Sequence, residues 1–168
     1  MSDSKATASI KLSKELRELM KNPNPSFSVG LVDQNLFKWN ITMFGPEGTP
    51  YDEGIFQAVM TFPDNYPFAP PTLVFKSKFW HPNVYLDGRV CISILHDAGD
   101  DPHQYEDAGE RWSPAQSVES ILLSVISMLS SPNADSPANV EAAVQMRGNL
   151  PAFRKKVRQF MNAEESAS

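Results

Sequence analysis

One cysteine stands in a short stretch whose residue types could carry nucleophilic chemistry. The stretch runs from His81 to Cys91, and Asn83 lies eight residues before the cysteine. A thiolate is a good nucleophile and leaving group, and an amide N–H can stabilise an oxyanion. A lone cysteine is also often a buried and inert side chain. The elements around this stretch must decide between the two interpretations.

The histidines suggest a cysteine-histidine hydrolase only weakly. They are His81, His96 and His103, and none lies in a local hydrolase signature with Cys91. His81 stands between Trp80 and Pro82, surroundings that favour a structural hydrogen-bonding role. We therefore interpret His81 as a brace for the loop.

Composition indicates one globular domain of 168 residues, with a core over about residues 9–161. One cysteine excludes an intramolecular disulfide and a cysteine-based metal cage, which favours a reducing compartment, the cytoplasm or the nucleus. No window approaches the roughly 20 apolar residues of a membrane span, and the N-terminal residues lack the apolar centre of a secretory signal.

The net charge of −5 arises in one segment. Residues 97–110 hold six acids and no Lys or Arg, while acids and bases nearly balance elsewhere. Clustered cations for phosphate binding are missing, so no nucleic-acid partner is expected. The sequence also has no phosphate-binding glycine loop and no calcium-loop spacing in this segment. We expect no bound cofactor and no metal.

The first half of the chain reads as one helix and four strands. Apolar residues at helical spacing predict a helix over 9–21. Alternating apolar residues then predict strands over 27–31, 37–43, 56–62 and 72–75. Short connections between successive strands indicate an antiparallel meander.

The second half reads as three helices after a long irregular segment over 80–111. Ser113 as a cap, Pro114 at the first helical position and Gln116 in a capping box predict the start of a long helix that crosses the sheet. Two further helices are predicted to begin at Pro137 and Pro151, and residues 162–168 to fray. The fold class is α+β: a four-stranded antiparallel meander, an N-terminal helix, a central helix across the sheet and two C-terminal helices.

An ordered set of motifs along the chain resembles the ubiquitin-conjugating enzyme family. The set comprises Tyr66–Pro71, His81-Pro82-Asn83, Cys91, Trp112-Ser113-Pro114 and Pro132-Asn133. The acidic insertion after the cysteine further resembles a subclass of which some members serve protein degradation at the endoplasmic reticulum. The implied fold is the ubiquitin-conjugating fold.

The resemblance implies that Cys91 accepts ubiquitin as a thioester and gives it to a substrate lysine, with Asn83 stabilising the oxyanion. Asn83 could also be only a turn residue. Exchange between thiols of similar pKa is nearly neutral in energy, so no strong activating base is required. ATP is consumed by the activating enzyme.

Many family members carry an acid directly before the position of Pro137, whereas this chain has Ser136 there. Our hypothesis is that Asp97, Asp100 or Asp101 assists the attacking lysine instead. These acids could equally form only a solvated loop.

The dipeptide Ser136-Pro137 also marks a candidate phosphorylation site, where a phosphate would add roughly −1.5 to −2 charge at a helix start. A simple helix cap is the alternative interpretation of this serine.

For partners, the resemblance implies ubiquitin, its activating enzyme, a ligase of the RING type and protein substrates. It places activating-enzyme binding at Lys11 and Lys14, and ligase binding at Phe68, Trp112, Ser113, Pro114 and Ala115. Charge alone allows the lysines to be a solvated face, and Phe68 could belong to the core.

The sequence leaves two alternative functions open and gives an expected localisation. The modifier could be a ubiquitin-like protein, or the chain a non-catalytic scaffold of the same fold; the presence of Cys91 and Asn83 argues against the scaffold. The chain is expected in the cytoplasm, with the nucleus as an alternative, and partners could recruit it to the endoplasmic reticulum surface.

Overall fold

A computed structural model describes residues 2–97, 111–133 and 137–167. Within them, one antiparallel sheet has the strand order β1-β2-β3-β4, formed by Phe27–Val32, Asn35–Phe44, Ile55–Thr61 and Thr72–Phe75. The first hairpin turns through Asp33 and Gln34, which both have positive φ (50° and 60°), as a tight two-residue turn requires. The predicted meander is confirmed.

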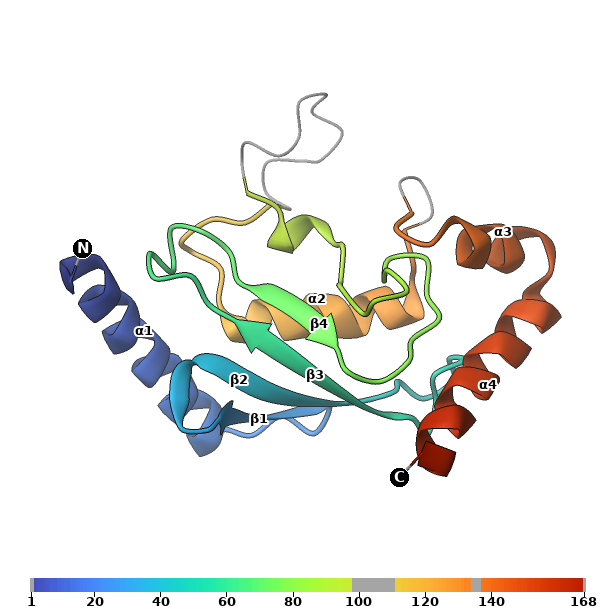
Figure 1. Ribbon diagram of the computed structural model, residues 1–168, viewed down its shortest axis with the longest axis horizontal. Coiled ribbons are helices and arrows are strands. Elements are labelled where there is room, and N and C mark those ends of the chain that lie inside the picture. The colour runs from blue at the N-terminus through green and yellow to red at the C-terminus, as the bar shows by residue number, and fades with distance from the viewer. Residues whose placement is uncertain (1, 98–110, 134–136, 168) are drawn as a thin grey trace.

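The sheet buries the face that its sequence alternation predicts. Trp39, Ile41 and Met43 of β2 are fully buried, whereas Lys38 and Asn40 beside them are exposed. The helix α2, Val118–Ser130, contributes the opposite apolar stripe, with Val118, Ile121, Leu122, Val125 and Leu129 in the same core. Figure 1 shows α2 running across the sheet, so the prediction of a central crossing helix is confirmed.

Helix α1 spans Ser2–Lys21, so the predicted start at Ser9 is wrong. Ala8 is fully buried, and the Lys5 ammonium lies 5.3 Å from the centroid of the Phe37 ring and 4.0 Å from Asp64 Oδ1. The first turns of the helix thus contact the sheet and the loop beyond it, although these residues carry little apolar periodicity.

Helix α2 begins at Val118 with Ser117 as its N-cap, so the capping box predicted at Ser113 is wrong. The Ser117 Oγ accepts from Ser120 N at 3.2 Å, and Ser117 N donates to Ser120 Oγ at 2.8 Å. Gln116 N instead donates to Ser113 O at 3.0 Å, which closes a turn before the helix.

Helix α3 begins three residues after its predicted proline, and helix α4 begins one residue before Pro151. Helix α3 is Val140–Gly148, and Asn139 Oδ1 accepts from Ala142 N at 3.0 Å. Helix α4 is Leu150–Ala167, so residues up to Ala167 are helical rather than frayed. Asn149 Oδ1 accepts from Ala152 N at 3.2 Å. In each case an asparagine supplies the cap and so sets the first helical residue.

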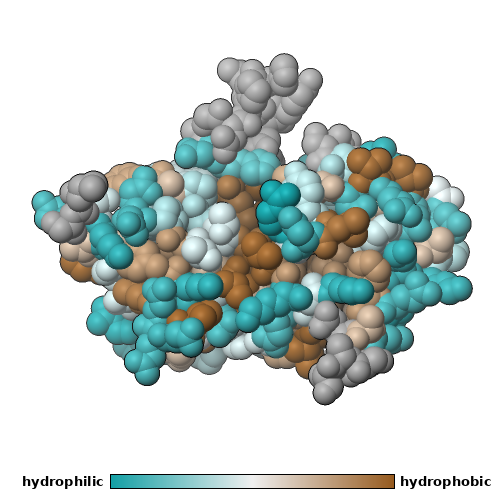
Figure 2. All heavy atoms as spheres, viewed as in Figure 1, coloured by the Kyte–Doolittle hydropathy of each residue, from teal (hydrophilic) through white to brown (hydrophobic). Residues whose placement is uncertain are grey.

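Helices lie at both ends of the molecule. Figure 1 shows α1 at one end of the molecule, α3 and α4 at the other, and the 3₁₀ turn η1, Ser93–Leu95, between them. Figure 2 shows apolar surface over α3, where Val140 and Val144 are 63% and 64% exposed. In the described part of the chain, no helix is long and apolar enough to cross a membrane.

Candidate active site

The segment that leads to Cys91 is fixed against the edge strand β4. Phe75 N donates to Gly88 O at 2.8 Å, and Val90 N donates to Leu73 O at 3.0 Å. Gly88 has φ +98°, and a Cβ there would lie 2.2 Å from Phe75 O. Only glycine fits this close approach, and the antiparallel pairing brings Cys91 beside the first residues of the strand.

His81 is fully buried and both of its ring nitrogens are used. Nδ1 accepts from Asn83 N at 2.9 Å, so Nε2 carries the hydrogen and donates to Met128 O at 2.9 Å. Burial lowers the pKa of His81 to about 4, although the hydrogen bond to Met128 opposes this shift. A neutral imidazole with a hydrogen bond at each nitrogen joins this loop to α2, and it has no nitrogen left for Cys91.

Asn83 is buried and joins two loops. Its Nδ2 donates to Asn133 O at 2.7 Å, and its Oδ1 accepts from Asn133 N at 2.9 Å. Its own carbonyl accepts from Cys91 N at 2.8 Å. The side chain therefore clamps the loop after α2 to the cysteine segment. This is the turn-bracing role, and one Nδ2 hydrogen remains outside the clamp.

Cys91 is a free cysteine of intermediate exposure. Its Sγ lies 3.5 Å from His96 Nε2, across the 3₁₀ turn η1. The sequence did not predict this contact, because no hydrolase signature joins the two residues. The usable signal was the spacing: a turn between positions 91 and 96 returns the second side chain toward the first.

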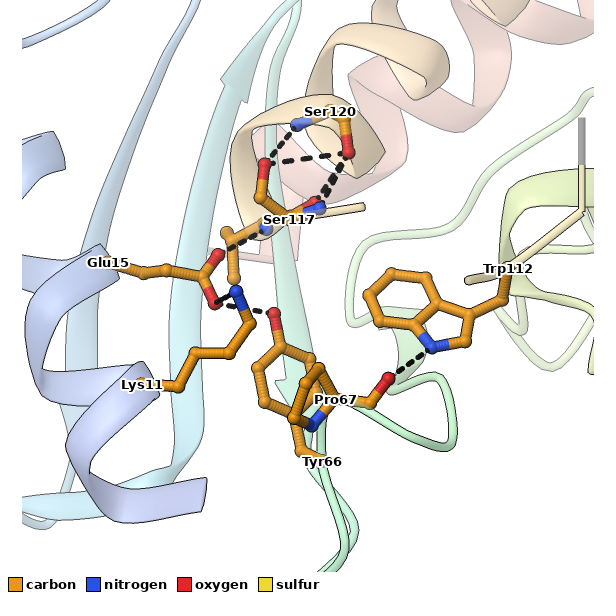
Figure 3. A network of polar contacts seen from close by, with 8 residues as sticks. Lys11, Glu15, Tyr66, Pro67, Trp112, Ser117 and Ser120 are labelled. Atoms are coloured by element: carbon orange, nitrogen blue, oxygen red, sulfur yellow. Dashed lines mark hydrogen bonds and ion pairs between the residues drawn. The ribbon is translucent and has the colours of Figure 1, made fainter. Parts of the chain in front are cut away.

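The proposed activating-enzyme and ligase faces are linked by a buried acid, Glu15 (Figure 3). Tyr66 Oη donates to Glu15 Oε2 at 2.6 Å, and Val118 N donates to Glu15 Oε1 at 2.8 Å. The Lys11 ammonium lies 3.6 Å from Oε2 of the same carboxylate. Burial and the hydrogen bond to Glu15 raise the pKa of Tyr66 well above its ordinary value. Lys14 is exposed on the same helix.

The sequence did not single out Glu15, although its position within the apolar stripe of α1 was a signal. Leu12, Leu16 and Leu19 share that stripe, and an acid among them must find partners when it is buried. Asn133 was named only as part of a motif, because its partner is a side chain 50 residues earlier.

The residues of the expected ligase site differ in exposure. Phe68 is 67% exposed, so it does not belong to the core. Trp112 is buried, and its Nε1 donates to Pro67 O at 2.8 Å (Figure 3). Trp112 therefore holds the loop that presents Phe68. Pro114 and Ala115 are exposed, and Ser113 is half-buried.

Part of the expected lysine-assisting set lies outside the described residues. Asp97 is described and exposed; Asp100, Asp101 and Ser136 are not described. Within the described ranges, no group of three or more His, Cys, Asp or Glu side chains could hold a metal ion.

Comparisons with known proteins identify the family. The family model described as ubiquitin-conjugating enzyme matches residues 11–161. Ubiquitin-conjugating enzyme E2 14 of Arabidopsis thaliana is 60% identical over 151 residues, covering 89% of this chain and 90% of that protein. Ubiquitin-conjugating enzyme E2 15 of Schizosaccharomyces pombe is 54% identical, with 89% and 90% covered. Ubiquitin-conjugating enzyme E2 G2 of Bos taurus is 47% identical, with 92% and 94% covered. Together with the sheet-and-helix arrangement, these matches show that the chain belongs to the ubiquitin-conjugating enzyme family and is a ubiquitin-transferring enzyme.

Proposed function

We propose that Cys91 is the residue that carries ubiquitin. The observation behind this proposal is the placement of the chain's one cysteine, partly exposed, at the end of a segment that Gly88 and Asn83 fix. A nucleophile for a macromolecular acyl donor must be both reachable and held in place. The Cys91 sulfur meets both conditions.

The proposed reaction has two steps. In charging, Cys91 Sγ forms a bond to the ubiquitin carbonyl carbon, the bond to the activating enzyme's cysteine breaks, and that cysteine takes up the thiol proton. In transfer, a neutral lysine amine forms the C–N bond, the bond to Cys91 Sγ breaks, and the amine proton returns to the sulfur. Both steps pass through a tetrahedral oxyanion.

Asn83 is proposed to serve both the loop and the oxyanion. Its clamp on Asn133 uses one Nδ2 hydrogen, which leaves a second donor for the charge that develops during transfer. Losing one such donor typically slows the chemical step by about 10²–10³-fold. Asn83→Ala should therefore charge on Cys91 and discharge slowly.

The acids after the cysteine are proposed to assist the attacking lysine. An ordinary lysine, pKa about 10.4, is almost fully protonated at neutral pH, and a carboxylate can hydrogen-bond the incoming amine. The support is that Asp97 is exposed and lies six residues after Cys91. Replacing Asp97, Asp100 and Asp101 together by Asn should slow discharge onto free lysine more than charging. Equal discharge rates for the triple variant and the wild type would remove the proposal.

The activating enzyme is proposed to bind on α1. Lys11 and Lys14 lie in one turn of that helix, and the Lys14 side chain is exposed. Lys14 offers an exposed cation to an acidic partner surface, whereas Lys11 is half-buried and paired with Glu15.

The ligase, of the RING type, is proposed to bind Phe68 together with Ser113, Pro114 and Ala115. Exposed aromatic residues on rigid loops are common hot spots. The hydrogen bond from buried Trp112 to the Phe68 loop supplies that rigidity.

The subclass, the localisation and the modification are proposals of the same kind. The six acids over residues 97–110 support membership of the subclass with an acidic insertion. We place the protein in the cytoplasm, with the nucleus as the alternative and recruitment to the endoplasmic reticulum surface by partners. Microscopy of the tagged chain tests this placement. Phosphorylation of Ser136 is tested by mass spectrometry of the protein from cells.

The experiment that tests the function is a charging assay. The protein is incubated with activating enzyme, ATP and either ubiquitin or a ubiquitin-like modifier, then run on a non-reducing gel. A thiol-sensitive adduct with ubiquitin that is absent in Cys91→Ala supports the proposal. An adduct that persists in Cys91→Ala, or one formed only with the ubiquitin-like modifier, would refute it.

A further inference from the structure

In the described part of the chain, the Cys91 sulfur contacts the imidazole of His96. The distance from Sγ to His96 Nε2 is 3.5 Å, which suits a thiol hydrogen donated to a ring nitrogen. The two residues flank the 3₁₀ turn η1, in which His96 N donates to Ser93 O at 2.9 Å and Leu95 N to Ile92 O at 3.0 Å.

Both ends of this contact are fixed by the fold. Cys91 N donates to Asn83 O at 2.8 Å, and Trp112 N donates to His96 O at 3.1 Å. Ile94, inside the turn, is buried in the core. The imidazole is therefore held beside the sulfur by backbone hydrogen bonds on either side and by an apolar anchor between them.

Neither His81 nor Asn83 can accept the thiol proton. Both nitrogens of His81 are engaged, with Asn83 N and Met128 O. The amide of Asn83 is paired with the backbone of Asn133. The sulfur thus meets an imidazole, the side chain best suited to move a proton near neutral pH.

We propose that His96 is a catalytic residue that accepts the Cys91 proton during charging. As Sγ bonds to the ubiquitin carbonyl carbon, the thiol proton passes to His96 Nε2. The bond to the activating enzyme's cysteine then breaks, and the departing thiolate takes a proton from the imidazolium or from solvent. This step rests on the proposed function of Cys91 as the ubiquitin acceptor.

The size of the effect follows from the ionisation of thiols. An ordinary cysteine, pKa about 8.5, is only about 3% thiolate at pH 7, so a base in contact can raise the rate by at most about 30-fold. At a pH of about 9.5 an ordinary thiol is mostly ionised, and the base adds little. Loss of a base therefore gives a deficit that disappears with rising pH, whereas loss of a structural contact does not.

Charged and titratable groups of the described chain border His96 on several elements. Cys91 contacts the His96 ring, and the exposed Asp97 follows His96 in the chain. Arg111 precedes Trp112, whose N–H donates to His96 O. Helix α2, which packs near η1, carries Glu119 as its charged residue. The variants below leave all of these unchanged.

The test is single-turnover transfer of ubiquitin from pre-charged activating enzyme to wild type, His96→Gln and His96→Ala, from a pH of about 6.5 to about 9.5. We expect His96→Gln to charge about 10- to 30-fold more slowly at pH 7 and within about twofold of wild type at the upper end. Added imidazole should partly restore His96→Ala at neutral pH. His103→Gln, a histidine substitution in the insertion, is the matched control.

Two results would overturn the inference: equal charging at neutral pH, or a deficit of the same size at every pH. Urea unfolding of both His96 variants shows whether they fold. If His96→Gln does not fold, rescue of His96→Ala by added imidazole tests whether residue 96 acts as the base. Wild-type protein that forms no adduct on Cys91 would contradict the proposed function itself, which separates the two failures.

Discussion

The side chain of His81 occupies a position where a charge would be costly. It is fully buried, with its nitrogens bonded to Asn83 N and Met128 O. Protonation would place a hydrogen on Nδ1, against the Asn83 N–H that now donates to it. The imidazole is therefore neutral in the folded protein.

This burial predicts a stability that falls in mild acid. The folded pKa of His81 is about 4, below the ordinary value of about 6.5. Below that ordinary value the unfolded chain binds a proton that the folded chain does not, so stability falls as the pH falls toward 4. Between a pH of about 7 and about 5 the loss from this group is about 2 kcal/mol.

Urea unfolding of wild type and His81→Gln across that interval measures the effect. The variant is less stable at neutral pH, because it loses the brace, but its free energy of unfolding should depend less on pH. If the free energy of unfolding changed equally with pH in the two proteins, the pH dependence could not come from His81.

At the residue scale, the sequence could single out candidate residues but not the contacts between them. Cys91, Asn83 and His81 could be selected from their types and spacing. The clamp between Asn83 and Asn133 and the approach of His96 to Cys91 could not, because each depends on how a loop returns in space. The roles of these residues in transfer stay predictions.

At the scale of elements, Glu15 fastens α1 to the start of α2 and to the Tyr66 loop (Figure 3). Its carboxylate accepts from a buried hydroxyl and from the first backbone N–H of α2. Removing the acceptor leaves both donors buried and unpaired, and each unpaired donor costs about 1–3 kcal/mol.

Glu15→Ala should therefore lower the free energy of unfolding by about 3 kcal/mol, and Glu15→Gln by less because it keeps an acceptor. Glu18→Ala, an exposed acid on the same helix, should change stability by no more than about 0.5 kcal/mol. Urea unfolding compares the three variants. Equal losses for Glu15→Ala and Glu18→Ala would show that the network contributes nothing.

The cap of α2 gives a second prediction at this scale. Ser117→Ala removes the side chain that accepts from Ser120 N and should cost about 1 kcal/mol. Ser113→Ala lies in the preceding turn and should cost little. Thermal unfolding of the two variants measures the difference, and a larger loss for Ser113→Ala would place the cap where the sequence suggested.

The elements themselves were largely predictable from the sequence. Apolar alternation located the four strands, and helical spacing located the stripe of α2. The start of α2 was not predictable, because Ser113 and Ser117 both suit a cap, and a tertiary contact between Val118 N and Glu15 Oε1 accompanies the observed choice. The early start of α1 likewise depends on contacts with the sheet and the loop after it.

At the scale of the molecule, the proposed partner surfaces and the cysteine occupy different elements. Figure 1 shows α1 at one end and η1 between the two groups of helices. The Tyr66 and Trp112 loops, which connect to α1 through Glu15, carry the proposed ligase face. The proposed partner surfaces and Cys91 thus share no residues and are connected through the packed core.

The central claim is that ubiquitin is carried on the side chain of residue 91, and the chemistry of the bond tests it most directly. Intact mass is measured after charging wild type, Cys91→Ser and Cys91→Ala, before and after treatment with a thiol. The account predicts a wild-type mass gain of one ubiquitin that the thiol removes, and a slowly formed serine ester that resists the thiol and is cleaved by mild base. A wild-type adduct that survives the thiol, or an adduct on Cys91→Ala, would contradict it.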